Sequence, residues 1–168
     1  MGGVWSWRGS NRTGRTDDPD PTTGLTSRDR YLIKSTWANI MESPTDNGVA
    51  LLVLYFEKFP DAKGVFPFKD VPTAELSTNA RFRAHCNSVI YAVASIVDSV
   101  DNIDLLVPIL EKVGRSHAPR NVTNELFMQL KETMLELFGK IMKKEEVEAW
   151  KKALEVVFTV ITKALADN

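Results

Sequence analysis

The sequence predicts an all-α protein. Beyond residue 24, apolar residues recur at spacings of three and four along most of the chain, which is the period of one face of an α-helix. No segment alternates apolar and polar residues as a half-buried strand would, and the sequence contains no internal repeat. With 168 residues, 43% of them hydrophobic, the chain is large enough for one folded domain with a continuous core.

Charge and cysteine content exclude several classes of function. The 21 basic and 22 acidic residues leave a net charge of −1, so the chain lacks the cationic excess that binds nucleic-acid phosphates. Its apolar runs fall far short of the ~20 residues that span a bilayer, and the N-terminus lacks a secretory signal, so we expect a cytoplasmic protein. Cys86 has no cysteine partner, and with only two histidines a structural zinc site has too few ligands.

The first 24 residues differ in composition from the rest. They hold five of the nine glycines and mostly small or polar side chains, which predicts a disordered extension before a domain at residues 25–168. The opening Met1 to Ser6 fits the pattern for N-myristoylation of Gly2. One acyl chain binds a membrane only marginally, so we expect weak, reversible membrane contact at most, and an unmodified extension is the alternative.

The first two helices have recognisable start signals. Thr26 or Ser27 can cap a helix whose inner face would hold Leu32, Ile33, Thr36, Trp37 and Ile40. The pair Ser43-Pro44, a cap followed by a proline in the first turn, begins a second helix that ends before Pro60. From Pro60 to Pro72, three prolines and a glycine prevent one regular helix. The apolar residues of this segment nevertheless predict a packed corner: Val65, Phe66 and Phe68.

The spacing predicts four further helices. They lie at about 79–98, from 103 to just before Pro119, at about 123–142, and at about 145–166. The chain's two histidines, His85 and His117, lie on the apolar stripes of the first two. If these helices face each other across an apolar gap, a flat apolar group bound through imidazole nitrogen would fit there, and haem has those properties. The residues that would surround it are Leu52, Phe66, Phe68, Val89, Val113, Val122 and Phe127. By periodicity alone, a bundle with two merely buried histidines is an equal alternative.

Several fragments, in order, carry a resemblance to a known family. They are LTSRDRYLIKSTW; Pro60 with Phe66 six residues later; FPFKDVP leading into ELSTNARFRAH; VGRSH; and EEVEAWKKAL. From Leu25 to Ala166 the chain thereby resembles the globins, most of all the intracellular globins of insects, with kinship to cytoglobin. The resemblance implies a fold of seven or eight helices around haem b, iron protoporphyrin IX.

The resemblance also implies roles for individual residues. His117 matches the proximal iron ligand, and His85 matches the distal residue, which can itself coordinate the iron. Phe66 matches the phenylalanine that packs on the ring, and the aliphatic pocket positions match Leu52, Val89 and Val122. Ser116 matches a position that hydrogen-bonds the proximal imidazole or a propionate, which would orient the ligand.

Propionate recognition is where the sequence departs from the family. Arg120 is a reasonable propionate partner. The position three residues after the distal histidine is often long and basic in globins, but here it is Ser88. The clamp on that side is therefore missing, or it is supplied by Arg81 or Arg83.

The expected function is reversible binding of dioxygen, for storage or facilitated diffusion, with carbon monoxide and nitric oxide as further ligands. His85 would donate a hydrogen bond to bound dioxygen, or occupy the iron itself when gas is absent. The alternatives are an enzyme, a nitric oxide dioxygenase or nitrite reductase served by a cellular reductase, and a redox or gas sensor. The chain carries no reductase domain, which favours oxygen binding over enzyme activity. We expect a monomer or a weak homodimer.

Overall fold

The computed structural model describes residues 18–167. All regular secondary structure in this part of the chain is helical, which confirms the all-α prediction. Residues 1–17 and 168, including the Gly2 acylation pattern, lie outside the described part. The described helices are, in order, α1 (Ser27–Ile40), α2 (Pro44–Lys58), the 3-10 helices η1 (Pro60–Val65) and η2 (Thr73–Thr78), α3 (Ala80–Asp98), α4 (Ile103–His117), the 3-10 turn η3 (Ala118–Arg120), α5 (Asn124–Ile141) and α6 (Lys144–Ala166).

Side-chain caps set most of the helix starts near the predicted positions. At α1, the Thr26 hydroxyl accepts from the Asp29 backbone N–H at 3.0 Å, and the Asp29 carboxylate accepts from the Thr26 N–H at 2.9 Å. The helices α3, α4 and α5 have single caps of the same kind from Asn79, Asn102 and Thr123. At the other end of α4, the chain tightens into η3 around Pro119, so His117 occupies the last helical turn as predicted.

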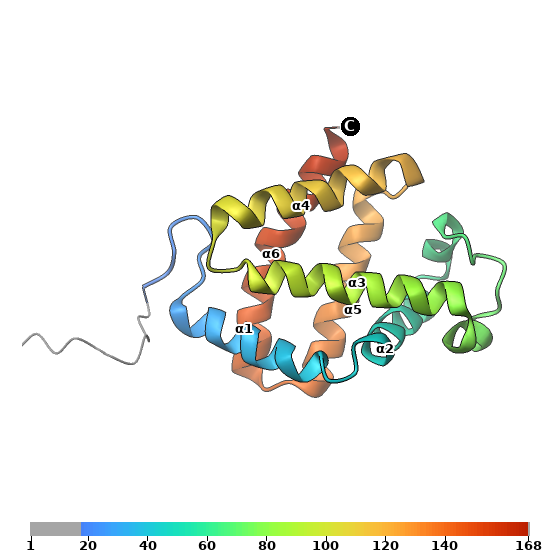
Figure 1. Ribbon diagram of the computed structural model, residues 1–168, viewed down its shortest axis with the longest axis horizontal. Helices are drawn as coiled ribbons and strands as arrows, with labels where there is room; N and C mark the ends of the chain where they lie inside the picture. Colours follow the sequence, from blue (N-terminus) through green and yellow to red (C-terminus); the bar gives the residue numbers. More distant parts are fainter. Residues whose placement is uncertain (1–17, 168) are drawn as a thin grey trace, which may run out of the picture.

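The helices form two crossing layers. In Figure 1, α1, α3 and α4 run across one face, and α5 and α6 cross behind them. The larger part of the core lies where α6 packs against α1, α4 and α5, with Trp37 and Trp150 at ring centroids 5.7 Å apart. A second cluster joins α2, the corner and the first half of α3, and it buries Phe56, Phe68 and Phe82. This second cluster confirms that the segment after Pro60 is a packed corner.

The folded unit begins before the predicted boundary at residue 25. Residues 20–25 form a turn in which the Asp20 carboxylate accepts from the backbone N–H groups of Thr22 (2.9 Å) and Thr23 (2.8 Å). Gly24 has a φ of +70°, which glycine adopts without strain, and Thr23 and Leu25 are buried. The composition predicts an extension through residue 24, but local hydrogen bonds hold residues 20–24 in a turn, and the burial of Thr23 beside Leu25 attaches this turn to the domain.

None of the helices described for this chain is long and apolar enough to cross a bilayer.

Candidate functional site

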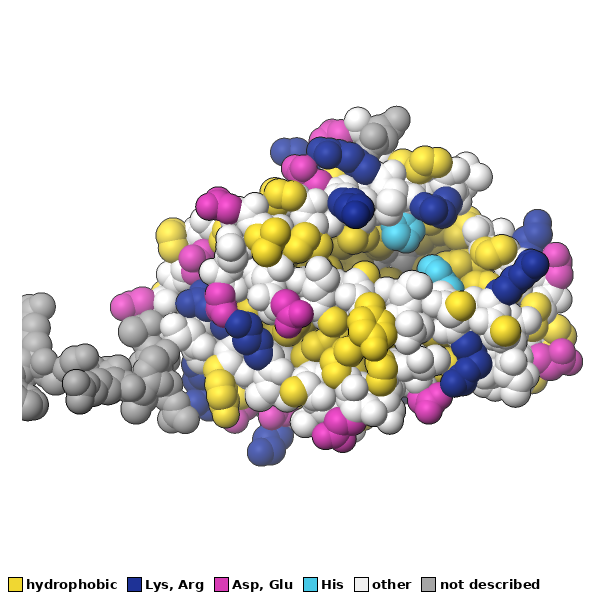
Figure 2. Space-filling model, in the orientation of Figure 1, with side chains coloured by type: hydrophobic (Ala, Val, Ile, Leu, Met, Phe, Trp, Pro, Cys, Tyr) yellow, Lys and Arg dark blue, Asp and Glu magenta, His cyan; other side chains and the backbone are white. Residues whose placement is uncertain are grey.

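A deep apolar cavity opens on the face where α3 and α4 lie side by side. Figure 2 shows both histidines of the chain, in cyan, at the edge of this hollow. Its empty space is about 1250 Å³, including the open mouth. The lining is apolar except for Thr23, Tyr55, His85, His117 and Trp150. Protein interiors are normally close-packed, so an apolar cavity that reaches from the surface into the core indicates a place for a mostly apolar group.

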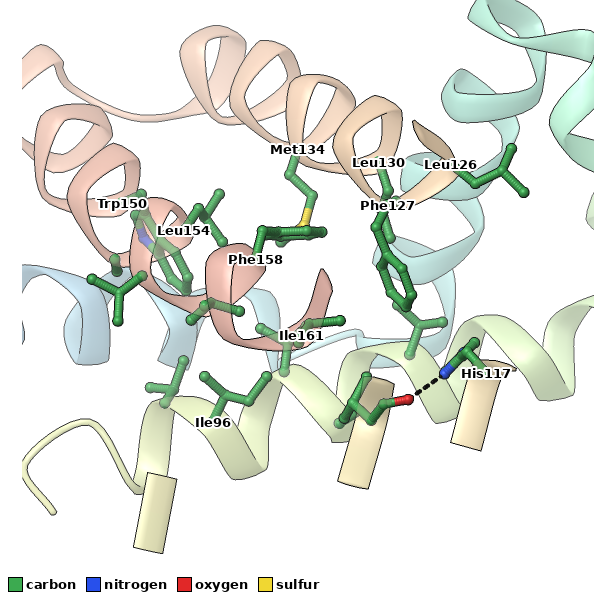
Figure 3. Close-up of a pocket in the computed structure, with 18 of the residues that line it drawn as sticks. Ile96, His117, Leu126, Phe127, Leu130, Met134, Trp150, Leu154, Phe158 and Ile161 are labelled. Carbon is green, nitrogen blue, oxygen red and sulfur yellow. Dashed lines mark hydrogen bonds between the residues drawn. The ribbon is translucent and has the colours of Figure 1, made fainter. Parts of the chain in front are cut away.

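His117 is fixed in orientation by its own helix. Its Nδ1 lies 2.7 Å from the carbonyl oxygen of Val113, one turn earlier, and this is the dashed line in Figure 3. A carbonyl can only accept, so Nδ1 carries the proton and donates, which leaves Nε2 as the nitrogen with a free lone pair. The Phe127 ring stands edge-on to the imidazole at 5.2 Å between centroids and limits its rotation. The arrangement suits a metal ligand.

Ser116 is a secondary partner of the same imidazole. Its Oγ lies 3.2 Å from His117 Nδ1, but the hydroxyl also donates to the Val113 carbonyl at 2.9 Å. Because Val113 is the nearer acceptor for the imidazole, Ser116 contributes little to its orientation. The residue is exposed and does not line the cavity.

His85 is held by packing alone. Its ring lies against Phe66, with centroids 5.1 Å apart at 70°, and it forms no hydrogen bond with another residue of the described part. Burial lowers the pKa of His85, and electrostatic interaction with the neighbouring His117 and Arg120 lowers it further. The imidazole is therefore neutral at pH 7, with one nitrogen able to donate and one able to accept.

Eight of the eleven predicted pocket residues line the cavity: Leu52, Phe66, His85, Val89, Val113, His117, Val122 and Phe127. Phe68 does not. Its ring stacks behind Phe66 at 5.1 Å and meets Phe82 edge-on at 5.3 Å, so it is buried in the second core cluster. Of the two phenylalanines predicted to surround the group, Phe66 lines the cavity, and Phe68 packs behind it.

The three arginines considered as propionate partners, in α3 and η3, have different surroundings. Arg83 is engaged away from the cavity, since its guanidinium donates to Asp46 at 3.0 Å and to the Ser77 carbonyl at 3.2 Å. Arg81 lies one helical turn before His85, is exposed, and has no ion pair with a described residue. Arg120 donates to the Ser116 carbonyl and lies close enough to His85 to affect its pKa. Of the two predicted alternatives, Arg81 is therefore the free cation on the His85 side.

Sequence reasoning missed Tyr55 and the far end of the cavity. The Tyr55 hydroxyl donates to the Leu126 carbonyl at 2.9 Å, which ties α2 to the start of α5, and burial raises the pKa of this phenol. Tyr55 follows Leu52 by three residues, so its place on the inner face of α2 was readable from the spacing. The far end includes Trp150 and Leu154, whose positions look like ordinary core positions in the sequence.

Cys86, next to His85, is fully buried in the second core cluster and does not line the cavity. Burial raises the pKa of its thiol to about 12, so it is an unreactive core residue.

Comparison with known proteins agrees with this geometry. The family model described as Globin matches residues 49–161. Cytoglobin-1 of Oryzias latipes is 31% identical over 153 residues, which cover 87% of this chain and 86% of the relative. A solved structure of a Drosophila melanogaster hexa-coordinate haemoglobin is 35% identical, with a TM-score of 0.78 over 83% of this chain and 94% of that one. The haemoglobin of the botfly Gasterophilus intestinalis is 26% identical, with a TM-score of 0.75 over 83% and 97%.

The matched segment covers more than half of the chain and includes both histidines, Phe66 and the cavity-lining residues of α5 and α6. Two imidazoles on one apolar cavity, one with its metal-binding nitrogen free, form a donor set that fits haem. The chain belongs to the globin family, and this membership implies that it binds haem.

Proposed function

We propose that this globin holds haem b between His85 and His117 and binds dioxygen reversibly, for storage or facilitated diffusion. The observation that carries the proposal is the pair of imidazoles on one apolar cavity, of which His117 is tied through Nδ1 to Val113. Haem would supply an iron centre that His117 would hold through Nε2 and that could take a small gas ligand.

The residues around the histidines serve this role by excluding water and orienting nitrogen atoms. Val113 keeps His117 in one tautomer, so Nε2 points its lone pair away from the helix. Leu52, Val89 and Phe66 line the His85 side with apolar surface. In that dry surrounding, a hydrogen bond from neutral His85 to a gas ligand with partial negative charge is stronger than in water.

The cationic side chains at the mouth are the proposed partners of the haem propionates. Arg81 stands one helical turn before His85 on α3, and Arg120, three residues after His117, lies close enough to His85 to lower its pKa. A guanidinium donates two parallel hydrogen bonds to a carboxylate, which suits a propionate at the edge of the protein.

We further propose that His85 coordinates the iron when no gas is present. Because its ring has no hydrogen-bond partner in the described part of the chain, no such bond must break for it to approach the metal. The Drosophila relative named above is a hexa-coordinate haemoglobin, which supports the proposal. A gas then binds only to the fraction of molecules in which His85 has moved away, so the apparent affinity falls in proportion to that fraction.

The test is a haem-binding titration followed by absorption spectra of the ferrous protein without gas. We expect one haem per chain and two sharp visible bands from two imidazole ligands, where a single broad band would show an open site. Repeated cycles of dioxygen addition and removal should restore the starting spectrum.

Two variants separate the roles of the histidines. His117→Ala should lose stable haem incorporation, whereas His85→Leu, the control in the same cavity, should keep haem and show the single broad band. Full haem content and an unchanged spectrum in His117→Ala would refute the assignment. Net consumption of dioxygen with nitric oxide and a reductant, faster than spontaneous reduction allows, would favour an enzyme over a store.

A further inference from the structure

The start of α5 is weakly fixed by its own residues. The bond from the Leu126 N–H to the Thr123 hydroxyl is 3.3 Å long, and so is the bond from the Phe127 N–H to the Thr123 carbonyl. Both are longer than the usual range of about 2.7–3.2 Å, and the ends of helices fray easily. Residues 123–125 are exposed. A contact from outside the helix is therefore needed to keep this turn in one position.

Tyr55 of α2 supplies that contact. Its hydroxyl donates to the Leu126 carbonyl at 2.9 Å, and among the described residues this is the one hydrogen bond that joins the first turn of α5 to another helix. Tyr55 is only 3% exposed, and its ring packs against Phe56 and Phe59 at 5.2 and 6.0 Å between centroids. Burial raises the pKa of the phenol, so the hydroxyl keeps the proton that it donates. The tyrosine thus provides a fixed point for the start of α5.

The residue after Leu126 limits the movement of the His117 imidazole. The Phe127 ring meets His117 edge-on, at 5.2 Å between centroids, and the same ring packs against Phe158 of α6 at 6.2 Å. Figure 3 shows the Phe127 side chain extending from α5 toward His117. The bond from Nδ1 to Val113 selects the nitrogen that faces the cavity, but a single bond still lets the plane of the imidazole turn within a range. The edge of Phe127 narrows this range.

The contacts of Tyr55 and of His117 meet in one peptide group. The carbonyl of Leu126, which accepts from Tyr55, and the backbone nitrogen of Phe127 belong to the same planar unit. A shift of this carbonyl therefore moves Phe127, and the ring that rests on His117 moves with it. Tyr55 is connected to His117 through one hydrogen bond, one peptide group and one ring contact.

We propose that Tyr55 is a positioning residue for His117: its hydroxyl holds the Leu126–Phe127 peptide, and Phe127 in turn holds the imidazole plane in one orientation. This role rests on the function proposed above, because the orientation matters for a nitrogen that binds iron. Without the hydroxyl, the imidazole samples a wider range of orientations and holds the iron less firmly.

The first measurement compares haem loss from Tyr55→Phe and from the wild-type protein. The substitution keeps the ring and removes only the hydroxyl, and the Leu126 carbonyl can still accept within α5, so the helix should be retained. Haem transfer to a haem-free acceptor protein should be about fivefold faster, which corresponds to the loss of one ordinary hydrogen bond. Circular dichroism should show wild-type helix content.

Proton NMR of the ferric cyanide complex reports the orientation of the ligand. Cyanide binds the iron in place of His85, so His117 is the one imidazole left, and the spread of the haem methyl resonances depends on the orientation of its plane. Tyr55→Phe should change this spread, which a loss of stability alone would not do. Tyr31→Phe and Tyr91→Phe make the same change at exposed tyrosines and should keep the wild-type resonances.

A further control loosens the same two helices at another place. Lys58→Met removes the ion pairs that join α2 to Glu132 and Glu136 of α5. These carboxylates lie about 9 and 15 Å beyond Leu126 along the helix. The variant should therefore weaken the contact between α2 and α5 without moving Phe127, and it should keep the wild-type resonances.

A double-mutant cycle tests whether Tyr55 acts through Phe127. Phe127→Leu should by itself speed haem transfer. If Tyr55 acts through this ring, the addition of Tyr55→Phe to Phe127→Leu should have no further effect, whereas the effects of independent residues would multiply. Multiplied rates would overturn the proposed role.

The haem content of the wild-type protein separates this role from the proposed function. A wild-type protein that takes up no haem would refute the proposed function. If the wild-type protein takes up haem, but Tyr55→Phe has the same resonances and the same transfer rate, the role of Tyr55 alone is refuted. An equal change of the resonances in Lys58→Met would also overturn it, because a general loosening of α2 on α5 would then explain the effect.

Discussion

The two histidines are held in different ways although they face the same cavity. His117 is fixed by a 2.7 Å hydrogen bond within its own helix and by the edge of Phe127. His85 is held only by the packing of Phe66 and the aromatic cluster behind it. A directed hydrogen bond fixes which nitrogen of an imidazole faces the cavity. Packing alone limits the space available to the ring but still allows the ring to rotate. His117 is thus fixed in orientation and His85 can rotate, which is consistent with the proposed roles of a fixed and a movable iron ligand.

The helices that carry them also dock differently. A methyl group at Gly48 of α2 would lie 2.7 Å from the Cys86 carbonyl oxygen, one residue after His85. A methyl group at Gly114, three residues before His117, would overlap the Ile161 carbonyl oxygen and lie 2.9 Å from the Ala164 Cβ. The His85 helix therefore rests on α2, in the smaller core cluster, and the His117 helix rests on α6, in the larger one.

The largest effect is expected from removing the packing that holds His85. Phe56→Ala removes a buried ring that contacts Phe66, Phe68 and Phe82, and should lower the free energy of unfolding by about 3–5 kcal/mol. Urea unfolding measures this loss. The same variant should weaken the two sharp ferrous bands that report His85 on the iron.

The control for that experiment is Phe138→Ala, which removes an equally buried ring that packs on Trp150, away from both histidines. It should lose similar stability and keep the wild-type spectrum. Identical spectra in the two variants would show that packing does not set the position of His85.

A smaller effect is expected where α4 crosses α6. Gly114→Ala should lower the free energy of unfolding by about 1–3 kcal/mol, because the backbone at Ile161 cannot move aside as a flexible side chain would. It should also speed haem loss, since His117 lies in the last turn of the displaced helix. Gly139→Ala, on α5 with nothing within 4 Å of the added methyl, is the matched control and should gain about 0.5–1 kcal/mol. Equal stabilities of the two variants would contradict the close crossing.

The smallest effect is expected at Ser116. Its hydroxyl is the more distant partner of His117 Nδ1, so Ser116→Ala should leave the Val113 bond intact and change stability by less than about 0.5 kcal/mol. The rate of haem transfer to a haem-free acceptor protein should stay within about twofold of wild type, the equivalent of about 0.4 kcal/mol. A tenfold faster transfer would mean that Ser116, and not Val113, orients the ligand.

Local chemistry determined the helix boundaries and the placement of both histidines. Side chains cap the starts of α1 and α3, and Pro44 and Pro119 mark a helix start and a helix end. These signals act within a few residues along the chain, so their effects can be predicted without knowledge of the fold. The spacing of three and four likewise places His85 and His117 on inner helix faces, because the period belongs to the helix itself. The resemblance to globins then linked the two faces to one cavity.

Only the tertiary structure decided which of several equivalent side chains reaches the cavity. Phe66 lines it and Phe68 does not, and Arg83 is engaged by Asp46 while Arg81 remains free. The far end of the cavity combines side chains of α1, α3, α4 and α6, and the burial of Leu25 attaches the turn at residues 20–25 to the core. Each outcome depends on contacts between residues far apart in the chain, whose relative positions a helical period does not encode.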